Sequence, residues 1–507
     1  MSKQTKAIFG DFQTPIELTR DVVELVLASD AAFAAVVEPT CGVGSFLLAT
    51  SERLGPAASY FGFELNPCYV KACQDAVGNA GIEAQIQQQD FYEMDWKTLF
   101  ARLPARVLVI GNPPWVTNAA LGAMGGDNLP VKSNFQGHNG FAAKTGKANF
   151  DISEWMLIQL LESLRGRPAT LAMLCKTATA RKVLRHAWRN NFDLGRCSLH
   201  VIDAARHFGV SVNACLLLAH TGVSNGDQRA TIYQDLSFAQ PLQVMGMVSG
   251  ELVSDTTAYL ELRDLDGVEY RRWRSGVKHD AARVMELERV AGGYRNGLGE
   301  TWPLEPDFVY PLLKSSDLAN GRLSPRRYVL LTQSRVSDDA AEIETLAPAT
   351  WSYLHDHCAA FDARGSSVYA NRARFAMFGV GPYTFAPWKV AVSALYQDLR
   401  FQAIGSLDDK PVVLDDTCYF FPCQSRQEAE FFASLLNAET GQRFLRSLIF
   451  FDSKRAITID TLRRIDLLKL AERLGQRKQA AAYLVDAPFE KGAQQMLLFD
   501  EQETYRV

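Results

Sequence analysis

The residues Asn112-Pro113-Pro114-Trp115 have types and an order that suit the binding of an aromatic amine. Two successive prolines lack backbone donors, so this turn presents carbonyl oxygens to a ligand. The Asn112 side-chain oxygen and the Pro113 carbonyl would accept both hydrogens of an exocyclic amine, which draws its nitrogen toward sp³ geometry and raises its nucleophilicity. Trp115 offers a flat apolar surface on which a base can stack. The motif predicts a site that activates a nucleobase amine.

A glycine turn precedes this motif in the chain. Glu38, Thr40, Cys41, Gly42 and Gly44 lie where an apolar stretch gives way to a helix-like segment. Glycines there let the backbone approach a ligand at a distance that side chains would prevent. By itself this pattern suits any nucleotide-binding α/β unit, and a plain tight turn between strand and helix is the alternative.

Carboxylates at the ends of the next two apolar stretches indicate which kind of ligand the glycine turn would bind. Glu64 ends the second stretch, where a carboxylate can accept both hydroxyls of a ribose. Asp90 and Phe91 follow the third stretch, and they suit an adenine amino group and the flank of its ring. Suitable residues at three successive strand ends favour a nucleoside-bearing cofactor over isolated surface acids.

The elements that carry these residues indicate an α/β fold. Short apolar runs alternate with amphipathic stretches from Val36 to Ala219, which is typical of a Rossmann-like doubly wound, mostly parallel sheet. The expected strands are Ala35–Glu38, Tyr60–Glu64, Ala84–Gln87, Val107–Ile110, Thr170–Leu174, Ser198–Ile202 and Ala214–Ala219. The expected helices are Pro15–Leu27, Gly44–Leu54, Cys68–Ala80 and Ile152–Leu164.

The alternation ends at a Gly-, Asn- and Ser-rich segment, Thr221–Gln228, after which strand-like pieces lie among long polar connections. We therefore expect a catalytic domain at residues 1–222 and a linker at 223–259. A mixed α+β domain would follow at 260–475, and a flexible tail at 476–507.

Composition excludes several classes of protein. No apolar run approaches the about 20 residues that span a bilayer, and no apolar stretch follows the first lysines, so we expect a soluble, cytoplasmic protein. Nine cysteines without a CxxC pair argue against a disulfide framework. His355, His357 and Cys358 lack a second ligand pair, so no metal is expected. The formal net charge of -4 does not by itself indicate a polyanionic partner.

The order of the motifs resembles that of amino-methyltransferases that use S-adenosylmethionine, in particular the gamma-group, TaqI-like DNA adenine-N6 methyltransferases. The resemblance is close from about residue 10 to 220 and loose beyond. The residues that carry it are Phe12-Gln13-Thr14-Pro15, Glu38–Phe46, Glu64, Asp90-Phe91, Asn112–Trp115, Asn149-Phe150-Asp151, Thr170–Lys176 and Ala205–Leu218.

The resemblance implies roles for individual residues. Thr14 and the glycine turn would hold the methionine part of the cofactor, with Glu64 on the ribose and Asp90 on the adenine. Phe208 would stack on the face of an extruded base opposite Trp115, although the family more often has Tyr or Phe where Trp115 stands. Base extrusion from duplex DNA costs a few kcal/mol, which two flanking aromatic rings can offset.

The second half loosely resembles the target recognition domains of this group. Basic residues that would contact DNA occur there and in the long polar stretch after Trp115, although solvated surfaces are the alternative for each. They are Lys132, Lys147, Arg274, Lys278, Arg364, Arg372, Arg374 and Lys389.

The sequence thus predicts a site-specific DNA adenine-N6 methyltransferase that flips its target base. We expect it to serve a restriction-modification or phage-defence system, with double-stranded DNA as substrate and a separately encoded nuclease or defence subunits as partners. No nuclease motif is found in the chain itself. The alternatives are an amino-methyltransferase acting on protein glutamine or ribosomal RNA, and a catalytically silent DNA-binding subunit.

Overall fold

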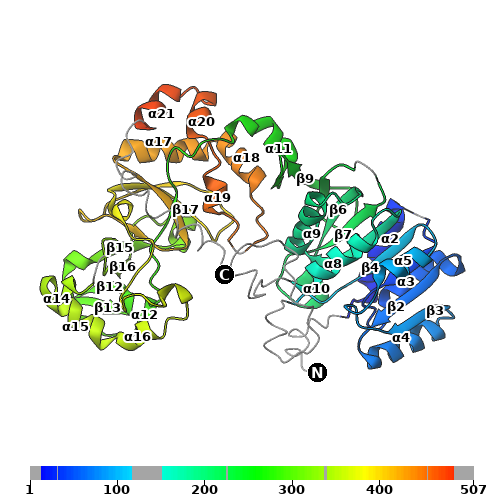
Figure 1. Cartoon of the computed structure of the whole chain (residues 1–507). Coiled ribbons are helices and arrows are strands. Elements are labelled where there is room, and N and C mark those ends of the chain that lie inside the picture. The colour runs from blue at the N-terminus through cyan, green and yellow to red at the C-terminus, as the bar shows by residue number, and fades with distance from the viewer. Residues whose placement is uncertain are drawn as a thin grey trace. The chain divides into compact units, whose positions relative to one another are not determined.

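The structure is a computed structural model that describes residues 13–30, 32–116, 151–223, 226–335, 340–453 and 455–484. It divides into two compact units, Met1–Thr257 and Ala258–Val507 (Figure 1). Each unit is described below by itself. In the described part of the chain, no helix combines the length and the apolar character needed to cross a membrane.

The first unit is built around a ten-stranded mixed sheet with the order β10-β9-β8-β6-β7-β5-β4-β1-β2-β3. The strands are β1 Ala35–Glu38, β2 Ser59–Glu64, β3 Ala84–Gln88, β4 Val107–Gly111, β5 Ala169–Lys176, β6 Leu194–Ile202, β7 Ala214–Thr221, β8 Arg229–Tyr233, β9 Pro241–Val248 and β10 Glu251–Val253. All seven strands expected from the sequence are present, with ends that differ by a few residues.

The sheet reverses its winding between β1 and β4. Val37 is the parallel neighbour of Phe61 in β2 on one side and of Val109 in β4 on the other. The chain therefore builds outward from β1 in one direction and from β4 in the other. Loops at the carboxyl ends of strands on either side of such a switch point diverge and leave room for a ligand. The glycine turn and the Asn112 turn follow these two strands.

Helices form two groups along the sheet. The helices α2, α3 and α4 pack against one another, as do α5, α8 and α9. Leu18, Val22 and Val26 of α2 follow one face at helical spacing and are fully buried. The bounds are α2 Ile16–Ser29, α3 Ser45–Leu54, α4 Pro67–Asn79, α5 Trp96–Arg102, α8 Ile152–Ser163, α9 Thr177–Arg189 and α10 Ala204–Phe208.

The segment 223–259, expected as a linker, instead contains three strands of the sheet. After the turn at Gly222 the chain returns as β8, which runs parallel to β6, and β9 and β10 extend the edge. Most residues of β9 are only partly buried, so the segment lacks the apolar signal of a central strand. The linker expectation was therefore wrong.

The second unit contains a four-stranded antiparallel sheet, β11-β20-β17-β18, and a six-stranded sheet, β14-β13-β12-β16-β15-β19. The strands of the first are β11 Arg274–Ser275, β17 Trp388–Ser393, β18 Gln402–Gly405 and β20 Cys418–Cys423. Those of the second are β12 Glu286–Val290, β13 Gly293–Asn296, β14 Thr301–Trp302, β15 Val309–Leu313, β16 Arg327–Leu330 and β19 Val413–Leu414.

Helices complete this mixed α+β unit. They are α11 Thr256–Leu262, α12 Ala282–Met285, α13 Ser315–Ala319, α14 Glu342–Leu346, α15 Pro348–Asp356, α16 Cys358–Asp362, α17 Arg426–Asn437, α18 Glu439–Leu448, α19 Ile459–Leu462, α20 Leu467–Arg473 and α21 Arg477–Leu484. The helix α21 begins the segment expected as a flexible tail. Ala480 is buried and the Tyr483 ring lies 5.5 Å from that of Phe431, so the expectation was wrong for this helix. Residues 485–507 lie outside the described part.

Candidate active site

The glycine turn after β1 has the backbone conformation that only glycine adopts readily. Gly42 has φ +50° and Gly44 has φ +86°. A Cβ atom on Gly42 would lie 2.5 Å from the Gln13 Oε1 atom, and one on Gly44 would lie 2.6 Å from the Cys73 Sγ atom. The turn thus packs closely against two other segments, and side chains at either glycine would displace it.

Two side chains fix this turn through its backbone amides. Glu64 accepts hydrogen bonds from the amide of Gly42, at 3.0 Å, and from the amide of Asn66, at 2.9 Å. Gln13 accepts one from the amide of Val43, at 3.2 Å. The carboxylate at the end of β2 therefore lies beside the glycine turn and holds it in place, and its contact with a ribose stays a prediction. Gln13 belongs to the Phe12–Pro15 motif, but the sequence assigned no role to its side chain.

Glu38 and Cys41 lie inside the turn and point into the protein. Glu38 is buried and accepts a hydrogen bond from the Leu47 amide of α3 at 3.3 Å, and burial raises its pKa well above the usual range. A hydrogen bond with Cys73, together with burial, raises the pKa of the Cys41 thiol. The Cys41 side chain belongs to the apolar core of the first unit, which leaves only its backbone for a ligand. Thr40, beside it, is partly exposed.

Asp90 and Phe91 follow β3 at the same edge. Asp90 is partly buried and accepts a hydrogen bond from the Tyr92 amide at 2.9 Å. The Phe91 ring is buried and lies 4.8 Å from the Trp96 ring. Burial, and then the neighbouring Asp90 carboxylate, raise the pKa of Tyr92. A polar group and an apolar wall are therefore adjacent after β3, and their contact with an adenine stays a prediction.

Asn112 begins the turn after β4 and is oriented by Thr14. Its side-chain amide donates to the Thr14 hydroxyl at 3.2 Å, across a sequence separation of 98 residues. Pro113 is buried and Pro114 partly buried. The Trp115 indole N–H donates to the Leu174 carbonyl of β5 at 3.2 Å. Two neighbouring elements thus hold the turn at both of its ends.

The Trp115 and Phe208 rings lie next to each other, as a direct ring contact without a gap between them. Their ring centroids are 5.1 Å apart and their planes make an angle of 72°, an edge-to-face contact. The sequence predicted a slot with a ring on each face of a base. A flat base has no room between the rings in this arrangement, so it could lie between Phe208 and Trp115 only if the two rings separated.

An ion pair that sequence reasoning missed lies next to this turn. The Lys176 ammonium at the end of β5 is 2.7 Å from the Asp151 carboxylate. The position of Lys176 as the last residue of a buried strand was the available signal, because strand ends of this edge carry the other polar residues.

Of the residues expected to contact DNA, two are buried in the second unit and a third is partly buried. Arg274 is buried, with its guanidinium 4.6 Å from the centre of the Tyr383 ring. Lys389 is 2% exposed, and its ammonium donates to the Ala386 carbonyl at 2.7 Å. Arg364 is partly buried and donates to the carbonyls of its own loop and of neighbouring segments. The expectation was wrong for Arg274 and Lys389, because buried side chains cannot reach a phosphate, and a DNA contact of the partly buried Arg364 stays a prediction.

The other residues expected to contact DNA are exposed or partly exposed, or lie outside the described residues. Lys278 pairs with Asp280 at 3.4 Å, and the exposed Arg374 pairs with Asp362 at 2.9 Å. Arg372 is exposed. Lys132 and Lys147, like Phe12, Asn149 and Phe150 of the motifs, lie outside the described residues.

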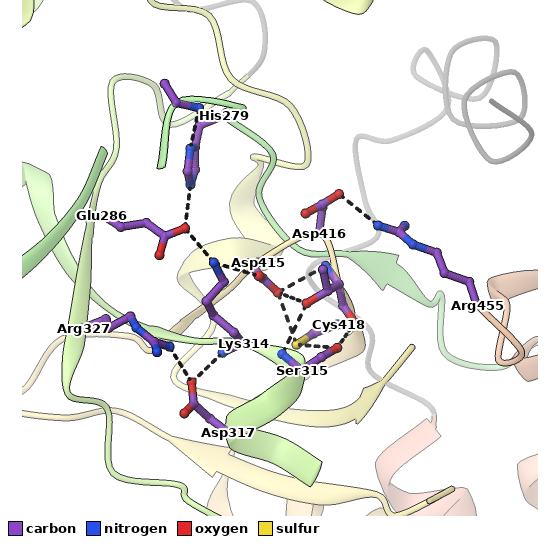
Figure 2. Close-up of polar contacts among 12 residues, drawn as sticks. His279, Glu286, Lys314, Ser315, Asp317, Arg327, Asp415, Asp416, Cys418 and Arg455 are labelled. Carbon is purple, nitrogen blue, oxygen red and sulfur yellow. Dashed lines mark hydrogen bonds and ion pairs between the residues drawn. The ribbon is translucent and has the colours of Figure 1, made fainter. Parts of the chain in front are cut away.

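A cavity of about 380 Å³ opens in the second unit, near the carboxyl ends of the parallel strands β15 and β19. Figure 2 shows Lys314 directed at Glu286 and Asp415, with distances of 2.7 and 3.7 Å. Burial lowers the pKa of His279 and raises that of Asp415. The lining holds four carboxylates and one lysine, which disfavours a phosphate ligand. The network instead joins β12, β15 and the turn after β19.

Comparisons with known proteins agree with the fold. The family model N-6 DNA Methylase matches residues 1–174. Over 473 residues the chain is 38% identical to Type II methyltransferase M.NspV of Nostoc sp., an alignment that covers 93% of this chain and 98% of that relative. The solved structure of the Type IIL restriction-modification enzyme MmeI in complex with DNA matches with a TM-score of 0.54 at 11% identity. That match covers 90% of this chain and 65% of the MmeI chain, and it shows likeness of fold alone.

Proposed function

The chain belongs to the N-6 DNA methylase family of type II methyltransferases, and from this premise we propose that it methylates adenine N6 in duplex DNA at a flipped-out base. The enzyme is a DNA methyltransferase of restriction-modification type. This membership favours DNA over the protein and ribosomal RNA substrates that share an Asn-Pro-Pro-aromatic turn. We propose further that it is of the gamma group, since its motifs occur in that group's order.

The residues around the glycine turn fit S-adenosylmethionine. At the close-packed glycine turn Gly42 and Gly44 are buried, whereas Thr40 and Val43 are partly exposed and could meet a ligand; Glu64 suits a ribose, and Asp90 suits an adenine amine. When bound, this cofactor supplies an electrophilic methyl group. Thr14 contacts Asn112 in the turn after β4 and its neighbour Gln13 contacts the glycine turn, so this segment would couple the two sites.

Asn112 and Pro113 activate the target amine in this proposal. Donation of the Asn112 amide N–H to Thr14 orients the amide, and its oxygen then accepts one hydrogen of the target amine. The Pro113 carbonyl accepts the other. Both interactions strengthen as the nitrogen gains positive charge, so they stabilise the transition state more than the ground state.

Base entry separates the two aromatic rings. Trp115 is anchored by its hydrogen bond to Leu174, whereas Phe208 ends the short helix α10, of which only Ala204 is buried. We infer that Phe208 moves and that the base takes its place against Trp115. Stacking of about 1–3 kcal/mol per base offsets the cost of extrusion.

We propose that the second unit recognises DNA and that a loop after α13 contacts the phosphates. Arg322, Arg326 and Arg327 are exposed within six residues. Arg322 and Arg327 share the carboxylate of Asp317, at 3.9 and 3.3 Å, which leaves an excess of positive charge on the loop. Guanidinium groups suit phosphate oxygens. A separately encoded nuclease would complete the restriction-modification system.

The hydrogen bond between Asn112 and Thr14 beside the glycine turn carries the proposed chemistry. Replacement of Asn112 by Ala should lower the rate of methyl transfer to unmethylated DNA by at least about 100-fold. Binding of S-adenosylmethionine, measured by calorimetry, should stay within about twofold of the native value. Asn190→Ala is the matched control, because Asn190 is exposed at the end of α9. Native activity in Asn112→Ala would refute the assignment.

A further inference from the structure

The ion pair of Lys176 and Asp151 lies within two residues of groups that hold Trp115. Leu174, which accepts the Trp115 indole N–H, precedes Lys176 by two residues in β5. The Lys176 and Asp151 side chains are 27% and 9% exposed, so the pair is largely shielded from water. Loss of one partner would leave the other charge poorly solvated.

Asp151 connects this pair to the chain that follows Trp115. The Ile152 amide donates to the Val116 carbonyl at 2.9 Å, which joins the start of α8 to the residue after Trp115. The other oxygen of Asp151 accepts the Ser153 amide at 3.1 Å and caps α8. Trp115 and Val116 are therefore held between the end of β5 and the start of α8, and the ion pair closes this arrangement.

A second ion pair joins α8 to the neighbouring helix α9, away from the turn. Lys182 in α9 lies 3.3 Å from Glu154 in α8, and the lysine side chain is 54% exposed. Both pairs connect a lysine at or after the end of β5 with an acid at the start of α8. The pair of Lys182 lacks the adjacent bonds to Trp115 and Val116. The chain thus supplies a matched comparison for the effect of Lys176.

We propose that Lys176 is a positioning residue for methyl transfer, acting through Asp151 to hold Trp115 as the fixed wall on which the target base stacks. The inference rests on the proposed function of the Asn112–Trp115 turn. Misplacement of a substrate-orienting group by about 1 Å costs on the order of 100-fold in rate. Apart from Thr14, which precedes α2, the proposed cofactor residues follow β1, β2 and β3, so the affinity for S-adenosylmethionine should not depend on Lys176.

The test compares Lys176→Met, Lys176→Arg and Lys182→Met in the full-length enzyme acting on unmethylated DNA. We expect kcat to fall about 10- to 100-fold in Lys176→Met with the KM for S-adenosylmethionine within about twofold. Lys176→Arg should recover most of the rate, and Lys182→Met should match the native enzyme. A native kcat in Lys176→Met, or an equal loss in Lys182→Met, overturns the inference.

Amide hydrogen exchange at Ile152 provides a measurement that does not need activity. In Lys176→Met this amide should exchange faster than in the native protein, and in Lys182→Met it should not. Unchanged exchange in Lys176→Met overturns the inference whatever the activity. Native activity in Asn112→Ala would instead refute the proposed function, so the two failures are distinguishable.

Discussion

Lys389 carries a buried positive charge, although the sequence predicted that it contacts DNA. The pH dependence of stability can distinguish these two positions of its ammonium. It lies in β17, 2% exposed, with its ammonium 5.9 Å from the centre of the Phe420 ring. Its ammonium donates to the Ala386 carbonyl. Burial lowers its pKa from 10.5 to about 7. Replacement by Met keeps an unbranched stem and removes the charge.

The magnitude follows from the difference between the two pKa values. The unfolded chain keeps the Lys389 proton up to about pH 10.5, whereas the folded protein releases it near pH 7. Between these values unfolding takes up a proton, so stability rises with pH. The full shift corresponds to about 5 kcal/mol, the cost that the charge imposes below pH 7. Removal of the charge should raise the free energy of unfolding, and loss of the hydrogen bond to the Ala386 carbonyl offsets about 1 kcal/mol of that increase.

Lys389→Met should therefore unfold at a higher free energy than the native protein near pH 7, by about 3–4 kcal/mol. Near pH 10.5 the advantage should vanish or reverse slightly. Urea titration with pulse proteolysis at a series of pH values measures both, and fragment size identifies the second unit. Lys278→Met is the control, since it removes the same charge from a side chain that is 33% exposed.

The opposite pattern would contradict the reasoning. If Lys389→Met were no more stable than the native protein at pH 7, with parallel curves at every pH, no buried charge would be present. If the variant also bound DNA more weakly and with a smaller salt dependence, the ammonium would lie on the DNA-facing surface after all.

Further outcomes are expected elsewhere in the chain. Gly42→Ala should weaken S-adenosylmethionine binding by about 10-fold in calorimetry, because its φ is +50° and the added Cβ meets Gln13, whereas Gly55→Ala, at φ +57° with open space, should not. Phe208→Ala should lower kcat/KM for DNA by about 5- to 100-fold through lost stacking, with cofactor affinity unchanged and Phe208→Tyr near native. The variant with Ala at Arg322, Arg326 and Arg327 should reduce the salt slope of DNA affinity by about 2–3, while alanine at Arg295, which pairs with Glu288, leaves it unchanged.

The sheet could be read from the sequence because its central strands are buried on both faces. Such strands appear as continuous apolar runs, and β1 and β4 are buried along their whole length. The residues at their carboxyl ends were then placed at one edge by topology alone. The strand β9, next to the edge of the sheet, carries no comparable signal, since most of its residues are only partly buried or exposed.

Side-chain partners across long separations could not be predicted. The bond between Thr14 and Asn112 spans 98 residues, and nothing local to either residue indicates the other. The prediction that Lys389 contacts DNA was wrong for the same reason, because its partners are distant in the sequence. A lysine beside Trp388 at the start of a strand suggests an exposed position, and only the packing of β20 and the neighbouring loop against it shows otherwise.

The contrast between the two aromatic rings bears on how the site opens. Trp115 is fixed from three directions, by the Leu174 carbonyl, by the bridge from Val116 to Ile152, and by the ion pair of Asp151. Phe208 ends a five-residue helix at Gly209, which has φ +70°.

The two ways of separating the rings differ in cost. Movement of Trp115 would break a buried hydrogen bond. Movement of Phe208 gives up an edge-to-face contact of about 0.5–1.5 kcal/mol, which stacking on the incoming base would replace. The cheaper route keeps Asn112 and Pro113 in place throughout, so in the proposed mechanism the two acceptors of the target amine would already be positioned when the base enters.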